Sequence, residues 1–302
     1  MTSANNLPNL FIIGAAKSGT TGLYATLHTH PQVFFPEFKK ELRFFSDDAN
    51  YARGLDWFAE TYFKGAEKFP VRGDATPHYI YWSDKVAPRI HQTFGASRPK
   101  IVAILREPAS RAYSHYWLGV RLHGETLPFE EALEKEEQRL REQHEELRAE
   151  GRIRWGYFRG GCYATQLKPF FELFPREDIL ILLQEELRDD FPSVASRLTS
   201  FLDLDPAHAL ELKVVNEAGE ARIEELQEFL THDSPVKSIF RKLFPKRLRD
   251  SVRRGLWKVN KRKVTYEPMA KETEAKLRQR YLPEIQELER MTGLSLKRWY
   301  PK

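Results

Sequence analysis

Short apolar runs alternate with segments of helical periodicity along most of this 302-residue chain. Continuous apolar runs predict buried strands, and they cover residues 10–13, 100–105 and 179–184, with shorter candidates at 33–35 and 71–73. Apolar residues at helical spacing predict helices over 21–28, 83–94, 109–120, 165–174, 194–202 and 269–291. Strands that alternate with helices predict an α/β fold, with a parallel sheet flanked by helices.

The segment 129–150 departs from this pattern because charged residues dominate it. Leu133, Leu140 and Leu147 recur there at intervals of seven residues. This spacing predicts one long, solvated helix with a thin apolar stripe. The stripe either packs on the rest of the chain, faces a ligand entrance or contacts a second subunit.

Composition places the chain among soluble globular proteins with a substantial core. Hydrophobic residues make up 41% and charged residues 30%, and the length is ordinary for one large α/β domain with insertions. Cys162 is the single cysteine, which excludes an intramolecular disulfide and fits a reducing compartment. The first ten residues lack the apolar core of a signal peptide, and no apolar run approaches the roughly 18–20 residues of a membrane span. We therefore expect a cytoplasmic protein.

The positive charge of the chain is concentrated in one segment. A net charge of +5 indicates acidic ligands rather than a nucleic acid partner. Residues 237–263, however, hold twelve lysines or arginines against one acid, Asp250, with apolar residues at loosely helical spacing. This pattern fits a helix that packs on the core with a solvated basic back. It also fits a peripheral contact with an anionic membrane or an acidic substrate.

Residues 10–22 read as a strand, a phosphate-binding turn and the start of a helix. Gly14 and Gly19 allow the backbone to turn tightly, so that successive N–H groups face an anion, and Lys17 adds a cation. The hydroxyls of residues 18, 20 and 21 are predicted to donate to the anion and to cap the helix. The lysine precedes the second glycine, which differs from the G-x-x-x-x-G-K-[ST] loop of nucleotide triphosphatases. We expect a phosphate-bearing ligand that is not ATP in its usual mode.

This loop resembles the 5′-phosphosulfate loop of sulfotransferases that use 3′-phosphoadenosine 5′-phosphosulfate (PAPS). Three further segments resemble the same family in the same order: residues 39–45 (KKELRFF), 73–79 (GDATPHY) and 101–117 (IVAILREPASRAYSHYW). The resemblance covers residues 8–205 well and is greatest to glycan-type sulfotransferases and their bacterial relatives. It implies a single sulfotransferase domain over 1–302, with a PAPS-binding core at 8–205 and a mostly helical part at 206–302. It also implies PAPS as co-substrate, adenosine 3′,5′-bisphosphate (PAP) as product, and no metal.

The resemblance assigns roles to residues of these segments. Lys17 stabilises the departing phosphate, and the cofactor's 5′-phosphosulfate is held by Ser18, Gly19, Thr20 and Thr21. Arg106 and Ser114 hold the 3′-phosphate of the cofactor. Glu41 occupies the position of the general base that takes the acceptor's proton, although the nearby Glu37 is a competitor on composition alone. Lys40 contacts the sulfuryl group or the acceptor.

The acceptor side differs from the family pattern at two positions. Arg43 stands where the family commonly has histidine, and Ala75 where it has lysine. The lost lysine suggests an acceptor less anionic than a heparan-like glycan. Together with Arg43, the predicted acceptor-binding residues are Lys40, Thr76, His78 and His115. The expected acceptor is a small-molecule, lipid or glycan hydroxyl, with an amine as the alternative.

Asn216 and Arg222 lie in a segment that resembles a loop over the cofactor in bacterial members, and they either contact the cofactor or belong to a solvated loop. Two rival functions stay open at this point. A P-loop kinase of small molecules needs a magnesium-binding carboxylate, but the predicted strand 100–105 ends in Arg106. A protein that binds PAP or PAPS without catalysis is the other rival, which the presence of Lys17 and Glu41 disfavours.

Overall fold

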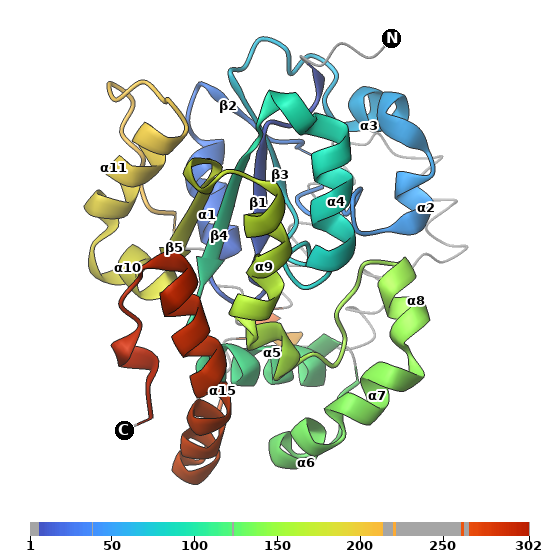
Figure 1. Cartoon of the computed structure of the whole chain (residues 1–302), viewed down its shortest axis with the longest axis vertical. Coiled ribbons are helices and arrows are strands. Elements are labelled where there is room, and N and C mark those ends of the chain that lie inside the picture. Colours follow the sequence, from blue (N-terminus) through green and yellow to red (C-terminus); the bar gives the residue numbers. More distant parts are fainter. Residues whose placement is uncertain are drawn as a thin grey trace. The chain divides into compact units, whose positions relative to one another are not determined.

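Five parallel strands form one sheet in the computed structural model (Figure 1). The structure describes residues 6–37, 39–122, 124–213, 220–221, 261–262 and 266–301. The strand order is β2-β3-β1-β4-β5, with bounds β1 Leu10–Gly14, β2 Val33–Phe34, β3 Val71–Ala75, β4 Lys100–Leu105 and β5 Ile179–Leu183. Because the strands are parallel, the carboxyl ends of β3, β1 and β4 lie side by side. The chain continues from β3 on one side of β1 to β4 on the other side, which makes a topological switch point beside β1. Ligands of open α/β sheets bind at such points.

Helices cover both faces of the sheet because strand residues alternate between two hydrophobic clusters. Phe11 and Ile13 belong to the first cluster, and Leu10 and Ile12 to the second. The first cluster includes residues of α4 (Ser83–Phe94), α5 (Pro108–Leu122), α9 (Tyr163–Leu173) and α15 (Lys271–Thr292), and the second includes residues of α1 (Thr20–His28), α10 (Gln184–Asp189) and α11 (Phe191–Phe201). Figure 1 shows α4 and α9 in front of the sheet. Each buried large apolar side chain contributes about 1.5–3 kcal/mol, so this alternation fixes which face of the sheet each strand residue occupies.

The predicted fold class is confirmed: a parallel sheet flanked by helices. The predicted strand 100–105 and helix 83–94 coincide with β4 and α4, and α5, which begins at Pro108, contains the predicted helix 109–120. The predicted helix 269–291 corresponds to α15, which packs against α5 and α9. The structure adds α2 (Asp48–Tyr51), α3 (Gly54–Tyr62) and α10, which the sequence pattern did not indicate.

The prediction of one long helix over 129–150 was wrong. The segment forms three short helices, α6 (Phe129–Glu134), α7 (Glu136–Glu142) and α8 (His144–Ala149). Tertiary contacts explain the breaks, because Glu136 is buried and accepts hydrogen bonds from the backbone amides of Phe158 (2.6 Å) and Arg159 (2.9 Å). The leucine stripe packs on the rest of the chain, which was the first of the three alternatives. Leu140 and Leu147 are buried in the first cluster, and Leu133 lies against it.

Residues 1–214 together with 269–302 form one compact unit, and residues 215–268 form another. In the second unit β6 (Glu220–Ala221) pairs antiparallel with β7 (Lys261–Arg262). The rest of the basic segment 237–263 lies outside the described residues, so its roles stay predictions, as does a single domain over 1–302. Within the described ranges, no helix combines the length and the apolar character needed to cross a membrane.

Candidate active site

The chain leaves β1 through a tight loop that ends at α1. The Ala15 amide donates to the Ile104 carbonyl of the neighbouring strand (2.7 Å), and the Ser18 amide donates to the Ala15 carbonyl (3.2 Å). Lys17 and Gly19 have left-handed backbone angles, with φ of 72° and 100°. Glycine adopts this conformation without strain, so Gly19 is suited to the last turn before the helix.

The N-terminus of α1 has no side-chain cap. Gly19 is the N-cap residue, which corrects the prediction that Ser18, Thr20 and Thr21 cap this helix: the capping position has no side chain. The Ser18 hydroxyl is wholly buried and satisfied by no hydrogen bond within the described residues. Uncapped N–H groups and the positive end of the helix dipole favour an anion. The loop therefore holds donors that suit a phosphate.

Arg106 reaches this loop from the end of β4. Its Nη1 donates to the Lys17 carbonyl (3.3 Å), and its own carbonyl accepts a hydrogen bond from the Tyr163 hydroxyl (2.9 Å). Burial lowers the pKa of Arg106 below its ordinary value, yet an arginine stays charged at neutral pH. Ser114 is half-buried in the next helix, α5. The structure thus joins Arg106 to the predicted phosphate loop.

Residues 39–45, the Glu41 segment, connect the phosphate loop to the predicted base. Lys40 Nζ donates to the Thr21 hydroxyl of α1 (2.6 Å). Phe44 and Phe45 are buried, as predicted, whereas Glu41 is half-buried. Among the described residues, no hydrogen bond or ion pair engages the Glu41 carboxylate. Glu41 therefore lies next to a residue bonded to the helix that follows the phosphate loop, and its carboxylate is bonded to no other described residue.

Two histidines predicted to bind the acceptor are neutral; His115 is buried, whereas His78 is half-buried. Burial lowers the pKa of His78, although the negative charge of Glu41 opposes this effect. Burial and the Arg111 charge hold the pKa of His115 well below 6.5, and His115 Nδ1 lies 3.2 Å from the Gly156 carbonyl. His78 Nδ1 has no hydrogen-bond partner in the described part of the chain. The Glu41 and Lys17 charges act on these histidines, so both histidines belong to the same site.

Asp74 is a charged residue that the sequence reasoning did not single out. It lies near the end of β3 and is wholly buried. Its carboxylate accepts hydrogen bonds from the hydroxyls of Thr76 (2.7 Å) and Tyr79 (2.7 Å). Burial, opposed by these bonds and reinforced by Glu41, raises the pKa of Asp74 to about 7. The signal in the sequence was a carboxylate next to an apolar strand, inside a family motif.

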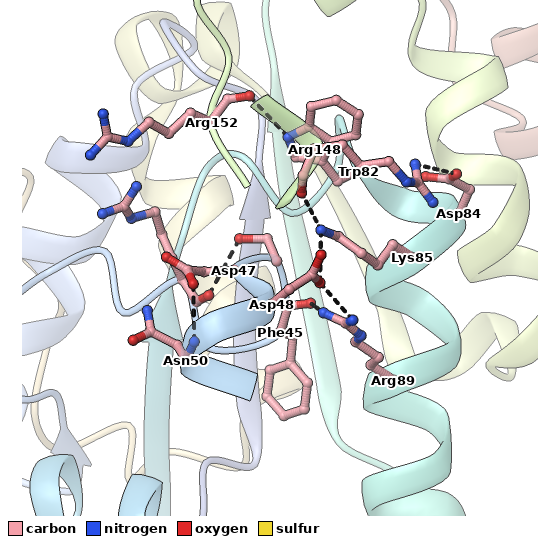
Figure 2. Close-up of polar contacts among 12 residues, drawn as sticks. Phe45, Asp47, Asp48, Asn50, Trp82, Asp84, Lys85, Arg89, Arg148 and Arg152 are labelled. Carbon is pink, nitrogen blue, oxygen red and sulfur yellow. Dashed lines mark hydrogen bonds and ion pairs between the residues drawn. The ribbon is translucent and has the colours of Figure 1, made fainter. Parts of the chain in front are cut away.

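Helix α4 fastens the chain just beyond the Glu41 segment. Arg89 donates to the Phe45 carbonyl (3.1 Å) and to the Asp48 carboxylate (2.7 Å), and Lys85 pairs with Asp48 at 3.2 Å. Figure 2 shows these side chains converging on Asp48. Basic side chains of one helix therefore fix the start of α2 and, with it, the end of the Glu41 segment.

The same helix also binds the end of α8 and the chain just after it. Asp84 pairs with Arg148 (2.7 Å), and Trp82 Nε1, just before α4, donates to the Arg152 carbonyl (3.1 Å), as drawn in Figure 2. Gly151 packs directly on Ser46: a Cβ added at Gly151 would lie 2.6 Å from the Ser46 carbonyl carbon. Its φ of 60° also favours glycine. Residues 148–152 thus form a fixed wall beside the Glu41 segment.

Two predicted site residues cannot be placed. Asn216 and Arg222 lie outside the described residues. Thr76 is placed, but its hydroxyl is wholly buried and already bonded within the chain, so a direct contact with an acceptor stays a prediction. Among the residues that the structure describes, no group of three His, Cys, Asp or Glu side chains could hold a metal ion.

Comparison with known proteins identifies the family of this chain. Residues 7–235 match the sulfotransferase domain. The chain is 28% identical over 214 residues to human bifunctional heparan sulfate N-deacetylase/N-sulfotransferase 3, covering 68% of this chain and 23% of that protein. It is 36% identical over 117 residues to the membrane-associated sulfotransferase kil1 of Dictyostelium discoideum, covering 38% and 24%. The chain thus matches about a quarter of the length of each relative.

A solved structure extends this similarity to nearly the whole chain. The crystal structure of a sulfotransferase from Alicyclobacillus acidocaldarius covers 97% of this chain and 98% of its own, with a TM-score of 0.69 and 25% identity. The matched domain takes in β1 to β5 and every described residue of the predicted phosphate loop and Glu41 segment. The chain therefore belongs to the sulfotransferase family.

Proposed function

We propose that this chain transfers a sulfuryl group from PAPS to an acceptor hydroxyl, with Glu41 as the general base. The observation that carries the proposal is the hydrogen bond from Lys40 to Thr21 (2.6 Å). It ties the Glu41 segment to the helix whose N-terminus forms the phosphate loop. Sulfuryl transfer needs a base and a phosphate site next to each other, because the acceptor oxygen attacks the sulfur that the phosphate leaves.

The residues present suit PAPS. Residues 17–21 would hold the 5′-phosphosulfate, since the α1 N-terminus is uncapped and the buried Ser18 hydroxyl lacks a partner among the described residues. Arg106 would hold the 3′-phosphate with its forked donors, aided by Ser114. Asn216 and Arg222 remain further candidates for this cofactor. PAPS supplies a sulfuryl group whose S–O bond to phosphate breaks as the acceptor oxygen bonds to sulfur.

The chain's own charged groups then divide the work. Glu41 takes the proton of the attacking hydroxyl, which is a poor nucleophile until that proton leaves. Lys17 faces the negative charge that develops on the departing phosphate, together with the N–H groups at the start of α1. The pKa values of His78 and His115 are lowered, so both side chains are neutral and weakly basic. They orient an acceptor by hydrogen bonding and leave the acceptor's proton to Glu41.

The acceptor class follows less directly. The names of the human relatives include heparan sulfate and N-sulfotransferase, which makes a glycan hydroxyl or amine one candidate here. Ala75 lacks the cation that the family pattern has at this position, whereas Lys39 and Arg43 flank Glu41. We therefore propose a glycan, lipid or small-molecule hydroxyl as acceptor, with an amine as the alternative.

The test is Glu41→Gln, with Glu37→Gln as its matched control. Glutamine keeps the shape of Glu41 but cannot take a proton, so sulfuryl transfer should fall by about 10²–10⁴-fold with PAP affinity unchanged. Glu37 is exposed, and its variant should stay near the wild-type rate. Labelled PAPS with a panel of hydroxyl and amine compounds measures the transfer. Near-normal turnover of Glu41→Gln would move the base elsewhere, and stabilisation by ATP with magnesium but not by PAP would favour the kinase.

A further inference from the structure

Asp74 is buried without an opposite charge bonded to it. Its exposed fraction is 0%, and no ion pair joins it to a cation among the described residues. Burying a carboxylate in this way costs several kcal/mol unless hydrogen bonds compensate. The residue also lies beside the first strand, since Asp74 is in register with Phe11 of β1. Because burial of the Asp74 carboxylate destabilises the fold, we expect a specific role of this residue at the carboxyl edge of the sheet.

Two hydroxyl groups connect Asp74 to the segment that carries Glu41. The Arg43 amide donates to the Thr76 hydroxyl (3.2 Å), which donates to Asp74 Oδ1 (2.7 Å). The Phe45 amide donates to the Tyr79 hydroxyl (3.2 Å), which donates to Asp74 Oδ2 (2.7 Å). We call these two paths the Asp74 bracket. Both paths begin on backbone amides within four residues of Glu41.

Only a carboxylate completes both paths. Each hydroxyl has one proton, and each accepts from an amide, so each must give its proton to Asp74. Above its pKa of about 7 the ionised Asp74 carboxylate accepts on both oxygens. An asparagine instead offers an NH₂ group to one of the two hydroxyls at every pH and leaves a proton without an acceptor. The bracket therefore explains why this position carries an acid rather than an amide.

The bracket holds a strained part of the segment. Arg43 has a φ of 55°, in the left-handed region, which costs roughly 1–2 kcal/mol for a residue with a side chain. The hydrogen bonds at Arg43 and Phe45 offset that strain. On the other side of Glu41, Lys40 is bonded to Thr21. Glu41 thus lies between two anchors, one on α1 and one on the chain that follows β3.

We propose that Asp74 is a positioning residue, which fixes the Glu41 carboxylate through the Thr76 and Tyr79 hydroxyls without touching the substrate. This inference rests on the proposed role of Glu41 as the base. It assigns Thr76 to the bracket, where sequence reasoning had placed it with the acceptor. A displacement of a catalytic group by about 1 Å can cost up to about 10²-fold in rate, so loss of the bracket should act on turnover.

The first experiment compares Thr76→Val with Thr76→Ser. Valine keeps the shape and loses the hydroxyl, and serine restores it. We expect Thr76→Val to lower kcat by about 10–10²-fold with KM for PAPS unchanged, and Thr76→Ser to recover most of the loss. Tyr79→Phe removes the second path and should give a loss in the same direction. Equal activity of the valine and serine variants, both folded, would overturn the proposal.

The second experiment needs no activity, so it separates this proposal from the proposed function. Amide hydrogen exchange of residues 39–47 should rise in Asp74→Asn and Thr76→Val, while β4 and α4 stay protected. Asp178→Asn is the matched control: Asp178 is also buried, but it pairs with Arg98 and Lys100 at the start of β4. Unchanged exchange in 39–47, or an equal rise in Asp178→Asn, would overturn the bracket. If the wild type transfers no sulfuryl group, the proposed function fails while this exchange result still decides the bracket.

Discussion

The burial of Asp74 predicts an unusual pH dependence of stability, which Asp74→Asn removes. The pKa of Asp74 is about 7 in the folded protein, against 3.8 for an exposed aspartate, because burial and the charge of Glu41 disfavour the carboxylate. Lys39 opposes this shift from the same segment. The Asp74 charge also acts on Tyr62 of α3, and the Tyr79 hydroxyl donates a hydrogen bond to the Asp74 carboxylate.

The sign follows from proton binding. Between the two pKa values the folded chain holds the proton and the unfolded chain does not, so stability falls as pH rises. Each pKa unit corresponds to about 1.4 kcal/mol, and the whole shift to about 4 kcal/mol. Between about pH 5 and about pH 8 the wild type should lose about 2.5 kcal/mol relative to Asp74→Asn, whose side chain does not titrate.

Urea unfolding followed by tryptophan fluorescence at several pH values measures this difference. Asp178→Asn supplies the control with the opposite sign. Burial of Asp178 alone would raise its pKa, but hydrogen bonds from Arg98 and Lys100 hold it below 3.8. Its stabilisation is therefore complete above that value and is lost only in acid, so its variant should show a flat difference from the wild type between about pH 5 and about pH 8. A flat difference for Asp74→Asn over the same range would refute the reasoning.

Three further predictions concern the site. Arg106→Ala should weaken PAP binding by about 2–5 kcal/mol, measured by calorimetry, because a desolvated charge pair is lost; unchanged affinity in a folded variant would remove Arg106 from the site. Lys17→Ala should lower kcat more than PAP affinity, because the charge it stabilises develops as the bond breaks; equal losses would make Lys17 a binding cation only. Gly151→Ala should cost about 1–3 kcal/mol in thermal unfolding, because its Cβ would overlap Ser46; a variant as stable as the wild type would show that the 148–152 wall can shift.

The centre of the sheet could be predicted from the sequence because β1, β4 and β5 are nearly continuous apolar runs. Residues 100–105 form β4 with the predicted bounds, and their side chains alternate between two clusters that each bury a face. The segment 129–150 shows the limit of such reasoning. Its leucine spacing correctly indicated a packed stripe. The break between α6 and α7, however, lies at the buried Glu136, which accepts hydrogen bonds from the distant amides of Phe158 and Arg159. Periodicity carries no information about partners that are far apart in the chain.

The candidate site divides in the same way. The loop after β1 and Arg106 were found because each follows an apolar strand in a recognisable motif. The hydrogen bond from Lys40 to Thr21 was missed, since it joins residues 19 positions apart; the contact of Lys40 with the sulfuryl group or the acceptor stays a prediction. Asp74 was missed because a carboxylate at the end of a strand normally faces water. Its burial depends on two hydroxyls that bond simultaneously to another segment.

The Glu41 carboxylate makes no hydrogen bond to a described residue, whereas its neighbours in the chain are held by several. A general base must keep its oxygens available for the substrate's proton, and no described residue bonds to Glu41. Its position must therefore come from its neighbours in the chain. Lys40 is fixed on α1, Arg43 and Phe45 on the Asp74 bracket, and the Phe45 carbonyl on Arg89 of α4. Because α1 also begins at the phosphate loop, the same anchors that hold Glu41 would set the distance between the proposed base and the proposed leaving group.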